Sequence, residues 1–210
     1  MKRRFNPEGW NRKEHFELFS RMDNPYVGVV AEVKCNKAYQ YAKANNISFF
    51  ALYLHCSMLA ENSVDEFKYR LEDDEIFIYD KIDCGTTIGR KDGTFGFAFI
   101  PYSEDFETFN ANLQHEIKEV ENCEGLHIKN EDLTLGLIRH STFPWSKFTG
   151  LTQPSNYGTK ESIPRIIFGK AYQQNDFMML PVSVDANHGF VDGLHLAKYL
   201  AAFEQELNKF

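Results

Sequence analysis

An almost unbroken apolar run from 177 to 184, Phe-Met-Met-Leu-Pro-Val-Ser-Val, most limits the folds open to this chain. A strand that is apolar on both of its faces fits the centre of a sheet covered from both sides. From about residue 193 the sequence continues as an amphipathic helix, with apolar residues at steps of three and four. We therefore expect a central strand that leads through a short loop into a closing helix.

Strands and helices alternate along the rest of the chain. Helical spacing predicts helices at 11–20, 48–60 and 106–120, and Asn11 and Ser48 are the expected N-caps of the first two. Alternating or apolar stretches predict strands at 26–33, 75–79, 84–88, 95–100, 133–140, 165–171 and 177–185. Because no linker or repeat divides these elements, we expect one α/β domain over residues 1–210, a mixed sheet with helices packed on one face.

Composition excludes several classes of protein. The chain has 23 basic and 30 acidic residues, a net charge of −7, which argues against non-specific nucleic-acid binding. No run of about eighteen apolar residues predicts a membrane span. The start, Met1-Lys2-Arg3-Arg4-Phe5, leads into polar residues and does not resemble a signal peptide. Four widely spaced cysteines and the scattered histidines give no metal motif. We expect reduced thiols, a cytoplasmic location and no metal.

The loop between the apolar strand and the last helix carries the clearest chemical motif. It reads Asn187-His188, then three residues later Asp192-Gly193. A histidine on a loop held between two rigid elements is a common setting for catalysis. By itself the motif also fits a simpler arrangement, in which Asp192 caps the last helix and His188 is a solvated loop residue.

Two further segments favour the catalytic interpretation of this motif. Residues 10–17 read Trp-Asn-Arg-Lys-Glu-His-Phe-Glu, and residues 141–149 read Ser-Thr-Phe-Pro-Trp-Ser-Lys-Phe-Thr. Together with the His188 motif, and with Phe-Gly-Lys at 168–170 and Leu-Pro at 180–181, they resemble the chloramphenicol acetyltransferase family in order and spacing. The resemblance covers nearly the whole chain. It implies a two-layer mixed β-sheet with helices on one face, and acetyl transfer from acetyl-CoA to a hydroxyl group.

The resemblance also implies roles for four residues. His188 matches the general base that takes the proton of the acceptor hydroxyl, a task suited to imidazole at neutral pH. Ser141 matches the serine whose hydroxyl donates to the tetrahedral oxyanion. Asp192 matches an aspartate that pairs with Arg12 and props the loop. The alternatives are an ordinary strand residue for Ser141 and a weak surface pair for Arg12 and Asp192.

The same resemblance suggests the binding surfaces. Trp145 and Tyr172 match positions at the coenzyme A channel, and Tyr26, Phe95 and Phe49 fall where the family places acceptor-pocket residues. Trp145 could instead fill the core beside Pro144, and Tyr26, Phe95 and Phe49 could be core packing. The family assembles as a homotrimer with active sites between subunits, so we expect the same here, with no nucleic-acid or membrane partner. Chloramphenicol is the first candidate acceptor, and antibiotic resistance is then the implied role.

The sequence departs from the family pattern at several positions. Asn187 replaces the first of two paired histidines, Ile167 replaces a threonine, and Ala171 replaces the first of two aromatic residues. Residues 150–154 also differ, on the segment that shapes the acceptor side. These changes leave two alternatives open. The acceptor could be another hydroxyl or an amine, or the chain could be a trimeric binding protein that no longer catalyses the reaction.

Overall fold

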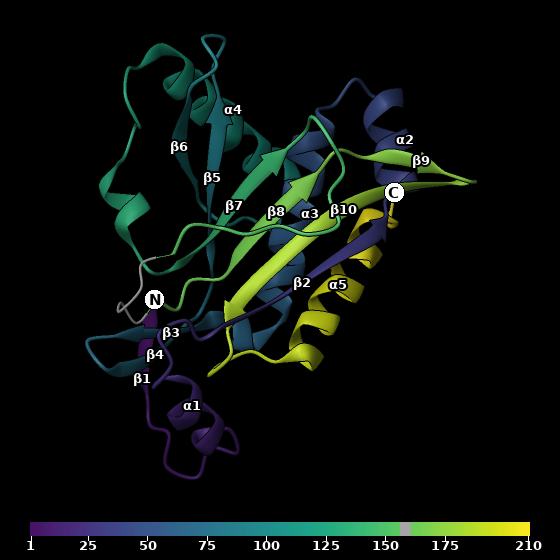
Figure 1. Cartoon of the computed structure of the whole chain (residues 1–210). Coiled ribbons are helices and arrows are strands. Elements are labelled where there is room, and N and C mark those ends of the chain that lie inside the picture. Colours follow the sequence, from purple (N-terminus) through teal and green to yellow (C-terminus); the bar gives the residue numbers. More distant parts are fainter. Residues whose placement is uncertain (156–160) are drawn as a thin grey trace.

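The computed structural model describes residues 1–155 and 161–210. Within these residues a seven-stranded mixed sheet forms the centre of the molecule (Figure 1). Its strand order is β2-β10-β8-β7-β5-β6, and β9 pairs with β10. The pairs β5–β7 and β7–β8 are parallel, and the other pairs are antiparallel. The strands are β2 (Tyr26–Lys34), β5 (Asp83–Gly89), β6 (Phe95–Ile100), β7 (Leu137–Phe143), β8 (Arg165–Gly169), β9 (Tyr172–Gln174) and β10 (Phe177–Asn187).

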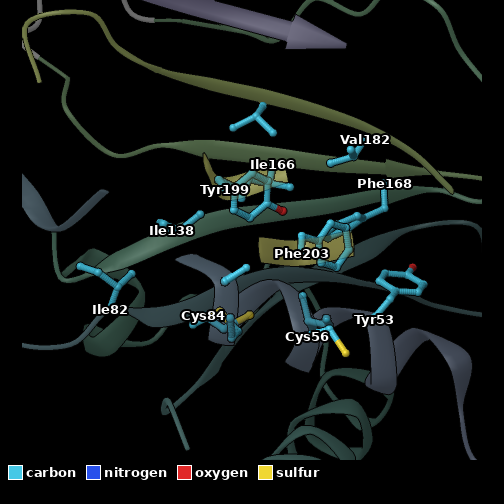
Figure 2. Packing of buried hydrophobic residues seen from close by; sticks show 14 of the residues in the cluster. Tyr53, Cys56, Ile82, Cys84, Ile138, Ile166, Phe168, Val182, Tyr199 and Phe203 are labelled. Carbon is cyan, nitrogen blue, oxygen red and sulfur yellow. The ribbon is translucent and has the colours of Figure 1, made fainter. Parts of the chain in front are cut away.

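Helices cover one face of this sheet. They are α2 (Asn36–Ala44), α3 (Phe49–Ser63), α4 (Phe106–Asn122) and α5 (Gly193–Leu207) (Figure 1). Figure 2 shows the core between the two layers, where Ile138, Ile166, Phe168 and Val182 of the sheet meet helix residues such as Phe203. No helix in the described ranges is long and apolar enough to span a membrane. The prediction of a mixed sheet with helices on one face is confirmed.

Side chains alternate between the two faces of the sheet. On β7 and β8 the helix-facing residues His140, Ile166 and Phe168 are buried. Their neighbours Arg139 and Ser141 therefore point to the opposite face, which we call the open face. Strand β10 lies between β2 and β8, and the central position predicted from its apolar sequence is confirmed.

Several elements differ from the sequence prediction. The structure adds helix α2 and the strands β1 (Lys2–Phe5), β3 (Tyr69–Glu72) and β9. Strands β1 and β3 pair with β4 (Glu75–Tyr79), whose bounds match the sequence prediction, in a separate three-stranded sheet. Two short 3₁₀ helices, Asp65–Lys68 and Asn130–Leu133, complete the elements of the described residues. The second occupies the predicted start of a strand, so β7 begins at Leu137 and continues to Phe143.

The two predicted helix caps had different outcomes. Ser48 caps α3, because its side chain accepts a hydrogen bond from the Ala51 amide. The prediction for Asn11 was wrong, since α1 (Lys13–Phe19) has Arg12 at its N-cap position and no side-chain cap. The Arg12 guanidinium is used elsewhere, as described below.

The sheet opens between β5 and β7. The two strands pair only from Asp83 to Gly85 and from Leu137 to Arg139. Beyond these residues β5 continues beside β6, while β7 continues beside β8 (Figure 1). The end of β7, which contains Ser141, thus borders a gap in the sheet.

Candidate active site

A cavity of about 1110 Å³ lies at this opening. Thr87 of β5 and Ser141 and Thr142 of β7 line it, together with Phe50 and Tyr53 from α3. Its lining thus includes residues of both strands at the opening, β5 and β7, and of helix α3 behind them. A mainly apolar cavity of this size with a few polar groups is typical of a binding site for a small molecule.

Ser141 presents its hydroxyl on the open face of β7. Its Oγ lies 3.1 Å from Thr87 Oγ1 on β5, and the residue is half-buried. In the β7–β8 register Ser141 pairs with Ile167, whose side chain also lines the cavity. Since Thr87 Oγ1 can accept or donate, the Ser141 hydroxyl can turn and donate to an oxyanion in the cavity.

His188 follows the last residue of β10 and is held in one tautomer. Its backbone amide donates to the Pro25 carbonyl at 2.7 Å, and its ring stacks on Phe19 with 3.9 Å between centroids. The Nδ1 atom lies 2.9 Å from the Val191 carbonyl oxygen. A carbonyl can only accept, so Nδ1 carries the hydrogen and Nε2 keeps a free lone pair. This is the arrangement that a general base needs.

Arg12 and Asp192 brace the loop of His188, as the sequence motif predicts. Arg12 Nη1 donates to Asp192 Oδ2 at 2.5 Å, and its Nη2 donates to the His188 carbonyl at 3.2 Å. Asp192 also caps α5, because Oδ1 accepts from the Leu194 amide at 2.9 Å. Burial alone would raise the pKa of Asp192, but the Arg12 hydrogen bond, the nearby His195 and the Leu194 amide together outweigh burial and lower it. The cap and the ion pair are therefore both present.

Asn187, the departure from the family pattern, has a structural role in this loop. Its Nδ2 donates to the Glu161 carbonyl at 2.8 Å, and its Oδ1 accepts from the Gly189 amide at 2.9 Å. The side chain is buried and links the start of the loop to the segment that leads into β8. The loop of His188 is thus held by Asn187 as well as by Arg12.

His188 and Ser141 are not neighbours within one chain. Ser141 pairs with Ile167, and Ile167 pairs with Ser183 on β10. Asn187 is four residues further along β10, so it lies about 13 Å along the sheet and two strand spacings, about 10 Å, across it. The residues that line the cavity of Ser141 do not include His188.

Three predicted binding residues lie on the open face or near it. Trp145 and Phe95 line the cavity with exposed fractions of 75% and 47%. Tyr172 on β9 lies outside the cavity lining. Its hydroxyl donates to Glu32 at 2.5 Å, and the Lys147 amine sits 4.4 Å from its ring centroid.

Tyr26 and Phe49 also lie outside the cavity lining. The Tyr26 hydroxyl donates to the Ile163 carbonyl at 2.8 Å, and in the β2–β10 register Tyr26 lies opposite Asn187, close to the His188 loop. Phe49 packs edge-on against Tyr53, and the next residue, Phe50, lines the cavity instead. Sequence position alone could not distinguish the two adjacent rings on α3.

A buried charged pair lies behind Ser141 that the sequence analysis missed. His140, on the helix-facing side of β7, places Nε2 2.8 Å from Glu61 Oε1 on α3, and both side chains are fully buried. Ser57 donates to the same oxygen at 2.5 Å, and its Oγ is 2.8 Å from the Tyr199 hydroxyl. Burial lowers the pKa of His140, but the negative charge of Glu61, the neighbouring Cys84 and the hydrogen bonds to both groups together outweigh burial and hold that pKa well above its usual value.

Comparison with known proteins identifies the family of the chain. The family model described as chloramphenicol acetyltransferase matches residues 3–204. Chloramphenicol acetyltransferase 3 of Escherichia coli is 23% identical over 98% of this chain and 96% of its own length. A chloramphenicol acetyltransferase of Clostridium perfringens is 24% identical over 91% of this chain and 88% of its own length.

Solved structures extend the comparison to the fold. A chloramphenicol acetyltransferase structure superposes with a TM-score of 0.92 and 31% identity, covering 99% of this chain and 100% of the other. A probable dihydrolipoamide acetyltransferase of Listeria monocytogenes, with a TM-score of 0.69 and 14% identity over 98% of this chain and 93% of its own, shares the fold. The chain belongs to the chloramphenicol acetyltransferase family and is an acyltransferase.

Proposed function

We propose that this enzyme transfers an acetyl group from acetyl-CoA to a hydroxyl of a small acceptor, with chloramphenicol as the first candidate. The observation that carries the proposal is the tautomer of His188, whose Nδ1–H is held by the Val191 carbonyl, while Nε2 forms no hydrogen bond within residues 1–155 and 161–210. The intact loop of Arg12, Asp192 and His188 favours this reaction over a binding protein that has lost catalysis.

In the proposed reaction Nε2 of His188 takes the proton of the acceptor hydroxyl while the hydroxyl oxygen attacks the thioester carbonyl. The Ser141 hydroxyl donates to the oxyanion that forms on this carbonyl. When the carbon–sulfur bond breaks, His188 returns its proton to the departing thiolate. The products are the acetyl ester and free coenzyme A, and His188 is again neutral.

The first experiment mixes the purified protein with acetyl-CoA and chloramphenicol and follows the release of coenzyme A thiol. We expect release that depends on both substrates, and an acetylated product by mass spectrometry. If chloramphenicol gives no thiol release while another alcohol or an amine does, the acyl transfer stands and the acceptor is a different compound. If no acceptor in such a panel gives release, the proposed function is wrong.

The separation of His188 and Ser141 supports a site shared between subunits, as in the homotrimer expected for the family. In this arrangement His188 of one subunit faces the cavity and Ser141 of the next. Trp145 and Tyr172 are the proposed contacts for coenzyme A, and Tyr26, Phe95 and Phe49 are the proposed acceptor contacts. A cytoplasmic location, where acetyl-CoA is available, is part of the same proposal.

Mixed trimers test the shared site. We expect that His188→Ala and Ser141→Ala proteins are each nearly inactive, and that co-expression of the two restores activity. Random assembly of equal amounts pairs an intact His188 with an intact Ser141 in about one quarter of the sites of a cyclic oligomer. Activity near that fraction of wild type is the expected result. If co-expression restores no activity, both residues act within one chain or not at all.

A further inference from the structure

The open face of β7 carries a charged group beside Ser141. Arg139 lies two residues before Ser141, so the two side chains leave the same face of the strand, about 7 Å apart along it. Both line the cavity. Because the cavity lining is mainly apolar, a guanidinium at this position strongly influences which molecules bind.

The donors of the Arg139 guanidinium are almost unused in the described residues. Its side chain is 54% exposed, and the nearest carboxylate oxygen, Glu161 Oε1, lies 4.0 Å from Nη1. Glu161 is already engaged, since its Oε2 accepts from Arg165 at 2.5 Å. Gly85, which pairs with Arg139 across the β5–β7 ladder, has no side chain to cover the guanidinium from that side.

Two other arginines that line the cavity are held by the protein itself. Arg165 donates to the Pro154 carbonyl at 3.1 Å and to Ser155 Oγ at 2.8 Å, besides Glu161. Arg90 donates to the backbone carbonyls of residues 95, 120 and 125 at 3.0, 2.7 and 2.8 Å. These guanidinium groups build the cavity wall. Arg139, which forms no side-chain hydrogen bond with the described residues, is available to a ligand.

Apart from Glu161, the acidic residues near the cavity lie away from Arg139. Asp185 pairs with Arg165 across the β8–β10 ladder, so it is two strands away from Arg139. It accepts a hydrogen bond from Gln153 at 3.0 Å. Glu121 and Asp132 line the cavity from α4 and from the second 3₁₀ helix, on the side of β6.

We propose that Arg139 selects acceptors that carry a carboxylate in addition to the hydroxyl to be acetylated. This inference rests on the proposed acetyl transfer and names a further class of acceptor besides chloramphenicol, a hydroxy acid with an apolar body. The planar guanidinium binds a carboxylate through two parallel hydrogen bonds, while Ser141, one side-chain step along the same face, serves the reacting centre.

Two compounds of matched shape test the proposal: 4-(hydroxymethyl)benzoate and its neutral analogue 4-(hydroxymethyl)benzamide. We expect wild type to acetylate the benzoate with a kcat/KM about 10- to 100-fold above that of the amide, the range for a hydrogen bond to a charged group. In Arg139→Met the ratio of the two kcat/KM values, benzoate over amide, is expected to fall to about one, and Arg139→Lys should restore part of the preference. Arg3→Met, an exposed position on β1 outside the cavity lining, is the charge-matched control.

Calorimetric titration with the two compounds separates this inference from the proposed function. Tighter binding of the benzoate to wild type, lost in Arg139→Met and kept in Arg3→Met, supports the role of Arg139 even if no acetyl group is transferred. That result without turnover would overturn the acetyl transfer alone. Equal binding of the two compounds, no measurable binding of the benzoate, or an unchanged preference in Arg139→Met overturns the inference.

Discussion

Replacement of His188 with Ala is expected to lower kcat about 100- to 10,000-fold, the contribution typical of a general base. The physical reason is specific to the ring. Nδ1 is held as a donor by the Val191 carbonyl, so Nε2 is the atom that takes the proton, and alanine has no replacement for it. Thiol release in a stopped assay, at saturating acetyl-CoA, measures the loss.

The control is His115→Ala, because His115 is exposed on α4 and lies outside the cavity lining. Its activity should equal that of wild type. Because the substitution also removes the stack of the His188 ring on Phe19, the thermal unfolding midpoint of the His188→Ala protein is measured as well. A folded His188→Ala protein that keeps a tenth or more of the wild-type kcat contradicts the role of His188 as base.

The parts of the fold with strong local signals could be predicted from the sequence. Strand β10 is recognisable from its apolar run, and α4 from apolar residues at helical spacing. Strand β1 has no such pattern in its sequence, because it consists of Lys2-Arg3-Arg4-Phe5. It forms by pairing with β4, where Arg4 Nη2 also lies 2.6 Å from Glu75 Oε1 at the surface. Helix α2 buries only the small residues Ala38 and Ala42, so its apolar stripe is faint.

Some residues of the candidate site could likewise be predicted from the sequence, and others could not. His188 and Asp192 belong to one short motif at the junction of a strand and a helix, and such a motif is visible in a single sequence. The neighbours of Ser141 are not visible in this way. Thr87 lies 54 residues from Ser141 in the chain. The two hydroxyls come together because β5 and β7 are neighbouring strands, and both residues lie just beyond the last paired residues, Gly85 and Arg139. Which of Phe49 and Phe50 faces the cavity depends on the rotation of α3, which spacing did not determine.

The pair of Glu61 and His140 shows most clearly what local sequence could not give, because 79 residues separate its members. Glu61→Leu is expected to lower the free energy of unfolding by about 3–5 kcal/mol, since it leaves a buried polar partner without its counter-charge. His140→Leu should cost a similar amount, because Glu61 then keeps the Ser57 hydroxyl but loses the imidazolium. Urea unfolding at one fixed protein concentration measures both losses.

The double variant Glu61→Leu/His140→Leu distinguishes a charged pair from two independent packing residues. Replacing both charges with apolar side chains removes the desolvation penalty, so we expect a stability close to that of wild type. If the two losses simply add, the residues do not act as a pair.

The pH dependence of the free energy of unfolding gives a second check. The pKa of His140 is raised in the folded state, so its stabilisation is complete below the ordinary value of 6.5 and declines as the pH rises through the raised pKa. The double variant should lack this decline at alkaline pH.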